Sequence, residues 1–191
     1  MLASITPLGE RSRRQRWWVT VTALITGAGV AGAAFGAALA GTGRALPLGT
    51  AVRLDLLLGI AALGATVDLL GRLPTHRRQV DELWLHRYRS WVYGLGFGAQ
   101  LGVGVSTIVT TGAVYVTLAA AALAQSVIAG AAIGGVFGLL RGATVLFAVH
   151  VDSPRRLALF HRRLRRLEPA ARRLALVAQA AVVAAVAAAT L

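Results

Sequence analysis

The chain has 191 residues, of which 57% are hydrophobic and 14% are charged, and its net charge is +13. This apolar content exceeds what a water-soluble domain of such length usually buries in one core, so the composition predicts a protein embedded in lipid. Cysteine is absent, which excludes disulfides, thiolate metal sites and dithiol redox chemistry.

All 20 basic residues are arginines, and most lie in short segments that flank apolar runs. In a soluble protein this charge would suggest nucleic-acid binding. Arginines beside apolar runs instead orient membrane helices and bind anionic lipid headgroups. We therefore expect the lipid bilayer and anionic lipids as partners, and no nucleic acid.

Residues 1–16 form a basic N-terminal segment, which we expect in the cytoplasm. The apolar run that follows, Trp17 to Ala40, is longer than the ~7–15 residues of a signal-peptide core. It matches the ~20 residues that cross a bilayer, and it is predicted as the first span.

A connector from Gly41 to Thr50 leads to a second predicted span, Ala51 to Leu70. Residues 71–90 mix arginines with acidic and aromatic side chains and are too polar for hydrocarbon. They are predicted to form a cytoplasmic loop.

No charged side chain occurs from Trp91 to Leu140, and two crossings fit this stretch best. The third span is predicted from Trp91 to Leu118 and the fourth from Val127 to Val149. The third is long for one crossing, and glycine clusters are an identifiable cause of kinks. A break near Gly102–Gly104 is therefore expected.

Residues 150–173 form an arginine-rich segment with leucines at helical spacing. It is predicted as an amphipathic cytoplasmic surface helix that Pro169 ends, with guanidinium groups on lipid phosphates. The arginines expected to face lipid are Arg155, Arg156, Arg162, Arg163, Arg165 and Arg166. The uncharged residues 174–191 are predicted as a C-terminal fifth span.

Each arginine cluster falls on one side of the membrane if the chain crosses five times from a cytoplasmic N-terminus, as the positive-inside rule requires. The predicted fold is an all-α, polytopic transmembrane bundle of about five spans, with six as the alternative. Residues 17–149 hold its first four spans, and the location expected is the bacterial inner (cytoplasmic) membrane.

Glycines recur at intervals of four residues in several predicted spans, which allows helices in lipid to approach closely. We expect helix packing within one subunit. A homo-oligomer interface and a backbone approach along a substrate path are the alternatives. The glycines are Gly32, Gly36, Gly94, Gly98, Gly102, Gly130, Gly134, Gly138 and Gly142.

Uncharged polar side chains concentrate in the predicted third span. Serine and threonine can bond their own helix backbone, whereas a primary amide in hydrocarbon needs partners beyond its own turn. Helix packing and a small polar substrate path both remain open for this group. The path candidates are Gln100, Ser106, Thr107, Thr110 and Thr111.

Arg141 lies deep in the predicted fourth span, where a charge is costly. Asp68, near the inner end of the second span, is the natural counter-ion, and an intramembrane ion pair between the two is predicted. Snorkelling of Arg141 to the headgroups is the alternative.

No catalytic constellation, metal-ligand spacing or Gly-rich nucleotide loop stands out in the sequence. We therefore predict no enzymatic activity, no cofactor and no metal site.

The stretch from Gly96 to Thr107, followed by the run from Phe137 to Gly142, resembles the second half of CcdA/DsbD-type thiol transporters and their sulfite-exporter-like relatives. The match covers about a third of the chain. The resemblance implies a small bundle of repeated halves with broken helices meeting at mid-membrane. The cysteine and proline of the redox members are missing here, which would leave transport or an accessory role.

Two functions follow as hypotheses. The first is a small membrane transporter whose path runs along the third and fourth spans. The second is a non-catalytic membrane subunit or assembly factor that packs other membrane helices and docks a cytoplasmic partner or anionic lipid.

Overall fold

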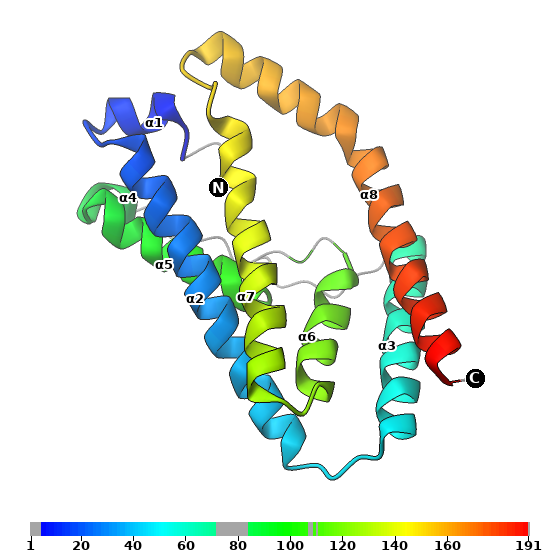
Figure 1. Ribbon diagram of the computed structural model, residues 1–191. Coiled ribbons are helices and arrows are strands. Elements are labelled where there is room, and N and C mark those ends of the chain that lie inside the picture. The colour runs from blue at the N-terminus through cyan, green and yellow to red at the C-terminus, as the bar shows by residue number, and fades with distance from the viewer. Residues whose placement is uncertain (1–4, 72–83, 107–108, 110, 191) are drawn as a thin grey trace.

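The computed structural model describes residues 5–71, 84–106, 109 and 111–190, and every regular element in these ranges is a helix (Figure 1). The predicted all-α class is confirmed. In chain order the elements are α1 (Pro7–Ser12), α2 (Trp17–Arg44), α3 (Thr50–Leu70), α4 (Trp84–Arg87), α5 (Ser90–Val103), α6 (Ala113–Leu123), α7 (Val127–Ala143), the 3-10 helix η1 (Thr144–Ala148) and α8 (Pro154–Thr190).

Four helical segments among the described residues are long and apolar enough to cross a membrane. These are Trp17–Arg44, Thr50–Leu70, Val127–Ala148 and Pro154–Ala188. The first three agree with the predicted first, second and fourth spans to within a few residues.

The predicted third span consists of two helices rather than one. Helix α5 ends at Val103, where Gly104 adopts a φ of +83° that favours glycine. The next helix among the described residues, α6, begins at Ala113 and ends at Leu123, beyond the predicted limit of Leu118. The break expected near Gly102–Gly104 is thus present, and α5 and α6 are both too short to cross a ~30 Å core alone.

Helices α2 and α5 run side by side in the same direction. A Cβ atom built on Gly94 would lie 2.7 Å from the backbone oxygen of Thr20, and one built on Gly102 would meet the backbone oxygen of Ala28. Contacts that ascend along both helices make the pair parallel. Because only hydrogen occupies these positions, the two backbones touch directly.

Helix α7 packs on another side of α2 in the opposite direction. Its Gly130 meets Gly36 of α2, and its Gly138 meets the backbone of Ala28. Helices α2, α5 and α7 therefore form a tight unit, which we call the glycine unit, at the left of Figure 1.

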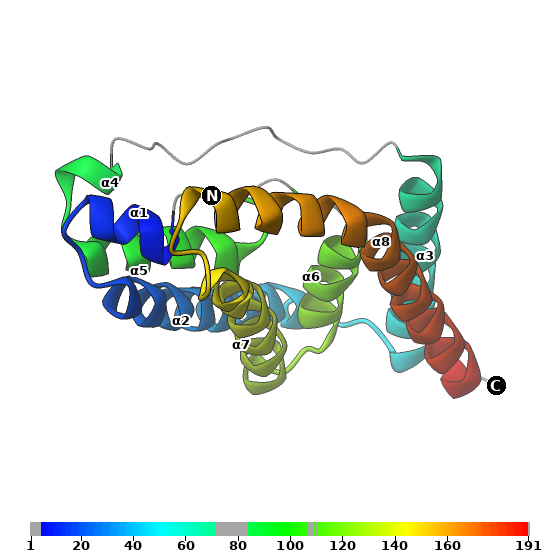
Figure 2. The ribbon, with the colours of Figure 1, turned by 90° about the horizontal axis from the view of Figure 1, so that it is seen from above.

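Helices α3 and α8 form a second, antiparallel pair, and α6 lies between this pair and the glycine unit (Figures 1 and 2). Both ends of α6 are fixed. The Arg53 guanidinium of α3 donates to the Leu123 oxygen at the end of α6, at 3.3 Å, and Gly112 contacts Gly64 of α3 just before its start.

Helix α8 corrects the prediction for the C-terminal region. Pro169 lies inside a continuous helix from Pro154 to Thr190 and does not end it. A proline removes one backbone donor and crowds the preceding turn, which bends a helix without necessarily breaking it. The ribbon changes direction part-way along, so its first half runs across the top of the molecule (Figure 1).

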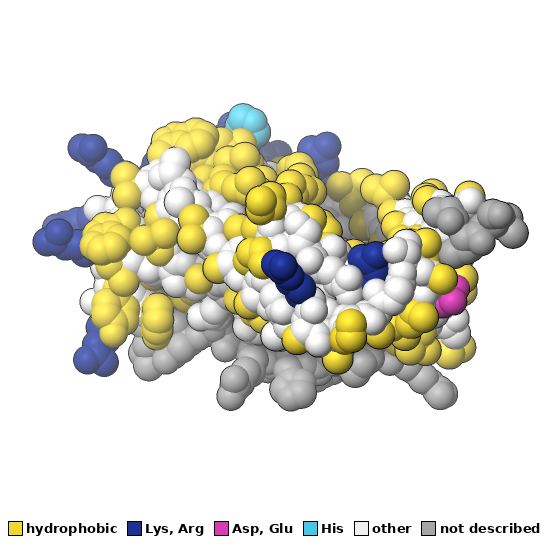
Figure 3. Space-filling model, turned by 60° about the horizontal axis from the view of Figure 1, so that its bottom comes forward, with side chains coloured by type: hydrophobic (Ala, Val, Ile, Leu, Met, Phe, Trp, Pro, Cys, Tyr) yellow, Lys and Arg dark blue, Asp and Glu magenta, His cyan; other side chains and the backbone are white. Residues whose placement is uncertain are grey.

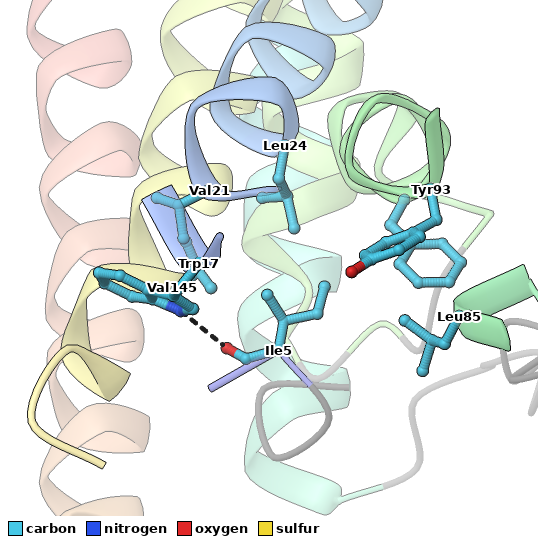
Figure 4. Packing of buried hydrophobic residues seen from close by; sticks show 8 residues of the cluster. Ile5, Trp17, Val21, Leu24, Leu85, Tyr93 and Val145 are labelled. Carbon is cyan, nitrogen blue, oxygen red and sulfur yellow. Dashed lines mark hydrogen bonds between the residues drawn. The ribbon is translucent and has the colours of Figure 1, made fainter. Parts of the chain in front are cut away.

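The N-terminal segment folds back onto the end of the bundle. Ile5 is 1% exposed and packs among apolar side chains of α2, α5 and η1, and its backbone oxygen accepts a 3.4 Å hydrogen bond from the Trp17 indole (Figure 4). The Leu8 amide donates to the Val151 oxygen at 3.0 Å. The basic N-terminal segment therefore packs against the bundle through Ile5, Thr6 and Glu10, which are buried.

Candidate functional site

The Asp68 carboxylate is the centre of a buried polar site on α3. Its side chain is almost entirely covered, with Asp68 5% exposed. One oxygen accepts from the Thr111 hydroxyl at 2.7 Å and from the Gln179 amide nitrogen at 2.6 Å. The Gly112 amide donates to both oxygens, at 2.8 and 2.9 Å. We call these four residues the Asp68 site.

Glycine makes the approach of α6 to α3 possible. A Cβ atom on Gly112 would lie 2.6 Å from the backbone oxygen of Gly64, closer than real Cβ atoms approach an oxygen. Because Gly64 and Gly112 have no side chains, the backbone amide of Gly112, the N-cap of α6, can reach the Asp68 carboxylate. Helix N-termini stabilise anions through such amides and through the helix dipole.

Gln179 reaches this site from α8 and is 2% exposed. Its amide nitrogen donates to Asp68, while its amide oxygen has no hydrogen-bond partner among the described residues. Sequence analysis did not single out Gln179. The signal was available, because it is the one polar side chain between Leu174 and Ala189.

Arg172 lies beside the site on the same helix. Its guanidinium donates to the backbone oxygens of Asp68 and Leu69 at the end of α3. It therefore caps the last turn of α3, where a cation is favourable. The Asp68 carboxylate itself has no ion pair with it.

The predicted ion pair between Asp68 and Arg141 does not form. Among the described residues, the partners of the Asp68 carboxylate are Thr111, Gly112 and Gln179. Arg141 instead donates to the Gly104 oxygen at 3.0 Å, and its guanidinium carbon lies 5.4 Å from the centre of the Phe137 ring.

The two charges serve opposite ends of the broken helix. Arg141 binds the oxygen of Gly104, next to the C-terminal end of α5, and Asp68 binds the amide at the N-terminal end of α6. A helix carries roughly half a negative charge at its C-terminal end and half a positive charge at its N-terminal end. Each side chain thus compensates a helix end, which explains why the two do not pair with each other.

Two other path candidates, Gln100 and Ser106, form no hydrogen bond with the Asp68 site among the described residues. Gln100 is half-buried on α5, and its backbone oxygen accepts from the hydroxyl of the exposed Ser106. Thr107 and Thr110 lie outside the described residues. Of the five candidates, Thr111 is placed at Asp68.

All nine of the glycines singled out in the sequence lie where helices meet. Eight of them would bring a Cβ atom against a backbone oxygen of a neighbouring helix, and Gly142 would meet the side chain of Ala28 and the backbone of Ile25 at 3.0 and 3.2 Å. These contacts are within one chain. They position α5 and α7, which carry the break and Arg141.

A second buried carboxylate, Glu10 of α1, was missed. It is fully buried, and one of its oxygens accepts from the hydroxyls of Thr20 and Tyr93, both at 2.6 Å. The other oxygen pairs with the Arg13 guanidinium, also at 2.6 Å. In the sequence Glu10 is one acidic residue within a basic run, which is more typical of a solvated segment.

The arginines expected to face lipid are exposed on the first half of α8: Arg155, Arg156, Arg162, Arg163, Arg165 and Arg166. Arg156 pairs with Asp152 at 2.7 Å. Figure 3 brings the lower end of the molecule forward, and there hydrophobic side chains and backbone predominate, with few charged groups. Charge is therefore unequal between the two ends.

No group of three or more histidine, cysteine or acidic side chains that could hold a metal occurs among the described residues. No family model matches the chain, and no match was found among curated proteins or solved structures. Function must therefore be inferred from the geometry alone.

Proposed function

We propose that the chain is an integral protein of the cytoplasmic membrane with five crossings and a cytoplasmic N-terminus. The four long apolar helices supply four crossings, and α5 with α6 supplies the third in chain order. The helix directions support this count, since α5 and α6 run parallel to α2 while α3 and α7 run antiparallel to it.

In this arrangement the break before α6 lies near mid-membrane, and the Asp68 carboxylate reaches it from the inner part of α3. The end of α6 is level with the connector between α2 and α3, because Arg53 binds Leu123 there. The 11 residues of α6 span about 17 Å, so its start lies about halfway through a ~30 Å hydrocarbon core. A carboxylate at that depth is costly and marks a functional site by default.

The function that this geometry supports best is membrane transport of a small solute. The proposal rests on one observation. The third span is broken, and the N-terminal end of α6 at this break binds the buried carboxylate of Asp68. Secondary transporters place their substrate and ion sites at such breaks, where irregular backbone lies against protein rather than lipid. The resemblance to thiol-transporter relatives points to the same class.

The two packing units suggest how access would alternate. The glycine unit is held by direct backbone contacts, whereas the α3–α8 pair joins it mainly through α6. Rocking of the pair against the glycine unit would open the Asp68 site to one side at a time. Alternating access in known transporters is largely of this rigid-body kind.

Reconstituted proteoliposomes test this proposal. We expect the wild-type chain to move at least one member of a panel of inorganic ions, amino acids, sugars and organic acids. Asp68→Asn should abolish that flux, because it removes the buried charge at the helix break. Asp55→Asn is the matched control, since Asp55 lies exposed on the same helix. Equal flux from both variants, or none from the wild type, would refute transport at Asp68.

A non-catalytic membrane subunit is the second candidate. The observation that favours it is the exposure of α3. Only 6% of the apolar stretch of α3 is buried inside the chain, compared with 33% of the apolar stretch of α2. A partner helix, rather than lipid, would then cover α3. Purification in mild detergent distinguishes the two, because a subunit should co-purify with a stoichiometric membrane partner and a transporter should function alone.

A further inference from the structure

The Asp68 site contains more acceptors than the donors around it can satisfy. Donors from Thr111, Gly112 and Gln179 all converge on the carboxylate, as an ionised, acceptor-only carboxylate requires. The Gln179 amide oxygen then has no donor, although its side chain is 2% exposed. A buried acceptor without a donor is unfavourable and calls for an explanation.

Two oxygen atoms and a methyl group of Val116 lie around the Cβ position of Gly64, next to this orphan. A Cβ atom built on Gly64 would lie 3.1 Å from the Gln179 amide oxygen and 3.5 Å from the Gly112 backbone oxygen. Gly64 is one helical turn before Asp68, so this space adjoins the carboxylate. Glycine leaves free there a volume that any other side chain would fill.

We propose that the Asp68 site binds a small monovalent metal cation, with Na⁺ as the ion of fitting size. The ligands from the chain are the Asp68 carboxylate and the Gln179 amide oxygen, and the Gly112 backbone oxygen already accepts from the Val116 amide at 3.1 Å. Oxygen donors of these kinds are the ligands of hard cations. The inference deepens the proposed function and rests on it, since the burial of a carboxylate inside the membrane is what makes a counter-ion necessary.

Charge favours a monovalent ion over a divalent one. The site holds one carboxylate, and the α6 N-terminus already supplies about half a positive charge. Arg172, the cation nearest in these contacts, binds the backbone oxygens of Asp68 and Leu69 and is exposed. A second unit of positive charge would remain uncompensated inside the membrane.

Thermal unfolding of the purified full chain in detergent tests the proposal. NaCl is titrated against choline chloride at fixed pH and ionic strength. A ligand that binds only the folded state raises the unfolding midpoint in proportion to RT ln(1 + [L]/Kd). We expect a saturable rise with Na⁺ for the wild type and none for Asp68→Asn.

Two glycine variants of α3 sharpen this test. Gly64→Ala places a methyl group 3.1 Å from the Gln179 oxygen and should weaken the apparent Na⁺ affinity by about tenfold or more, while every ligand is kept. Gly59→Ala is the matched control, because nothing lies within 4 Å of its Cβ position. If Asp68→Asn fails to fold, the Gly64 and Gly59 pair still decides the question.

A wild-type midpoint that responds neither to Na⁺ nor to Li⁺ would overturn the proposal. The same conclusion follows if Gly64→Ala responds as Gly59→Ala does, or if the midpoint depends on pH alone. Binding in detergent is independent of flux. Na⁺ binding without solute transport would support the ion site and refute the transport proposal. Solute transport that does not depend on Na⁺ would support transport and refute the ion site.

Discussion

Several charged residues of this chain bind backbone groups at helix ends rather than one another. Asp68 and Arg141 each satisfy one end of the broken span, and Arg53 and Arg172 donate to the last backbone oxygens of α6 and α3. Backbone groups at helix ends have no partner within the helix and need one in lipid. Charged side chains supply it here.

The separate roles of Asp68 and Arg141 predict additive effects. Asp68→Asn and Arg141→Leu should each lower the free energy of unfolding, and the double variant should equal their sum within ~0.5 kcal/mol, because the side chains share no contact. A double-mutant cycle in detergent measures this. A coupling energy above ~1 kcal/mol would mean that the two charges interact.

Glu10 should be important for stability despite its place in the N-terminal segment. Glu10→Ala removes the acceptor for Thr20, Tyr93 and Arg13, and we expect a loss of about 2–4 kcal/mol, since charged buried hydrogen bonds are strong. Thermal unfolding measures the loss. The exposed Glu168→Ala is the control, and equal midpoints for the two variants would contradict the buried role.

At the scale of elements, the sequence predicts a helix correctly where one apolar run forms one helix. The spans from Trp17, Thr50 and Val127 follow from length and hydropathy alone, and the break at Gly104 from glycine clustering. Two features depend on distant parts of the chain. The start of α6 is set by Asp68 and Gly64, and α8 continues past Pro169, where its second half packs on α3. The hydrophobic periodicity of the sequence does not predict either of these long-range contacts.

The glycine unit predicts which small residues tolerate a methyl group. Gly138→Ala would press a Cβ atom on the backbone of Ala28, and overpacking of this kind costs about 1–3 kcal/mol. Gly41→Ala on α2 meets nothing within 4 Å and should be neutral or slightly stabilising. Unfolding midpoints compare the two, and equal losses would argue against direct backbone packing.

The first half of α8 should select anionic lipid. Its exposed arginines accompany exposed Leu159, Leu164 and Leu167, and each arginine near a charged surface contributes about 1 kcal/mol. Replacing Arg162, Arg163, Arg165 and Arg166 by Gln should reduce the anionic lipid retained by the purified chain. Unchanged retention of acidic and neutral lipid would count against this surface role.

At the scale of the whole molecule, the sequence predicted the long apolar helices better than the site. The arginine clusters predict a topology without any knowledge of packing, because only position along the chain matters. The Asp68 site draws residues from α3, α6 and α8 that lie up to 111 positions apart. One of them, Gln179, sits in a run whose composition indicates only a span.

The topology itself can be measured with reporter fusions. Fusions after Thr42, Gln125 and Leu191 should report the outside, and fusions after His76 and His161 the cytoplasm. Five crossings with alternating directions require this order. A cytoplasmic result at Leu191 would remove the last crossing and with it the placement of Gln179 inside the membrane.

The separation of the Asp68 partners along the chain has a consequence for biosynthesis. Asp68 precedes Thr111 by 43 residues and Gln179 by 111, so the ribosome completes α3 well before its partners exist. During that interval α3 carries an unpartnered carboxylate two residues from its end, where the cost is smaller than the about 3 kcal/mol of a charge at a helix centre. The Asp68 site is therefore completed only after α8 has been synthesised.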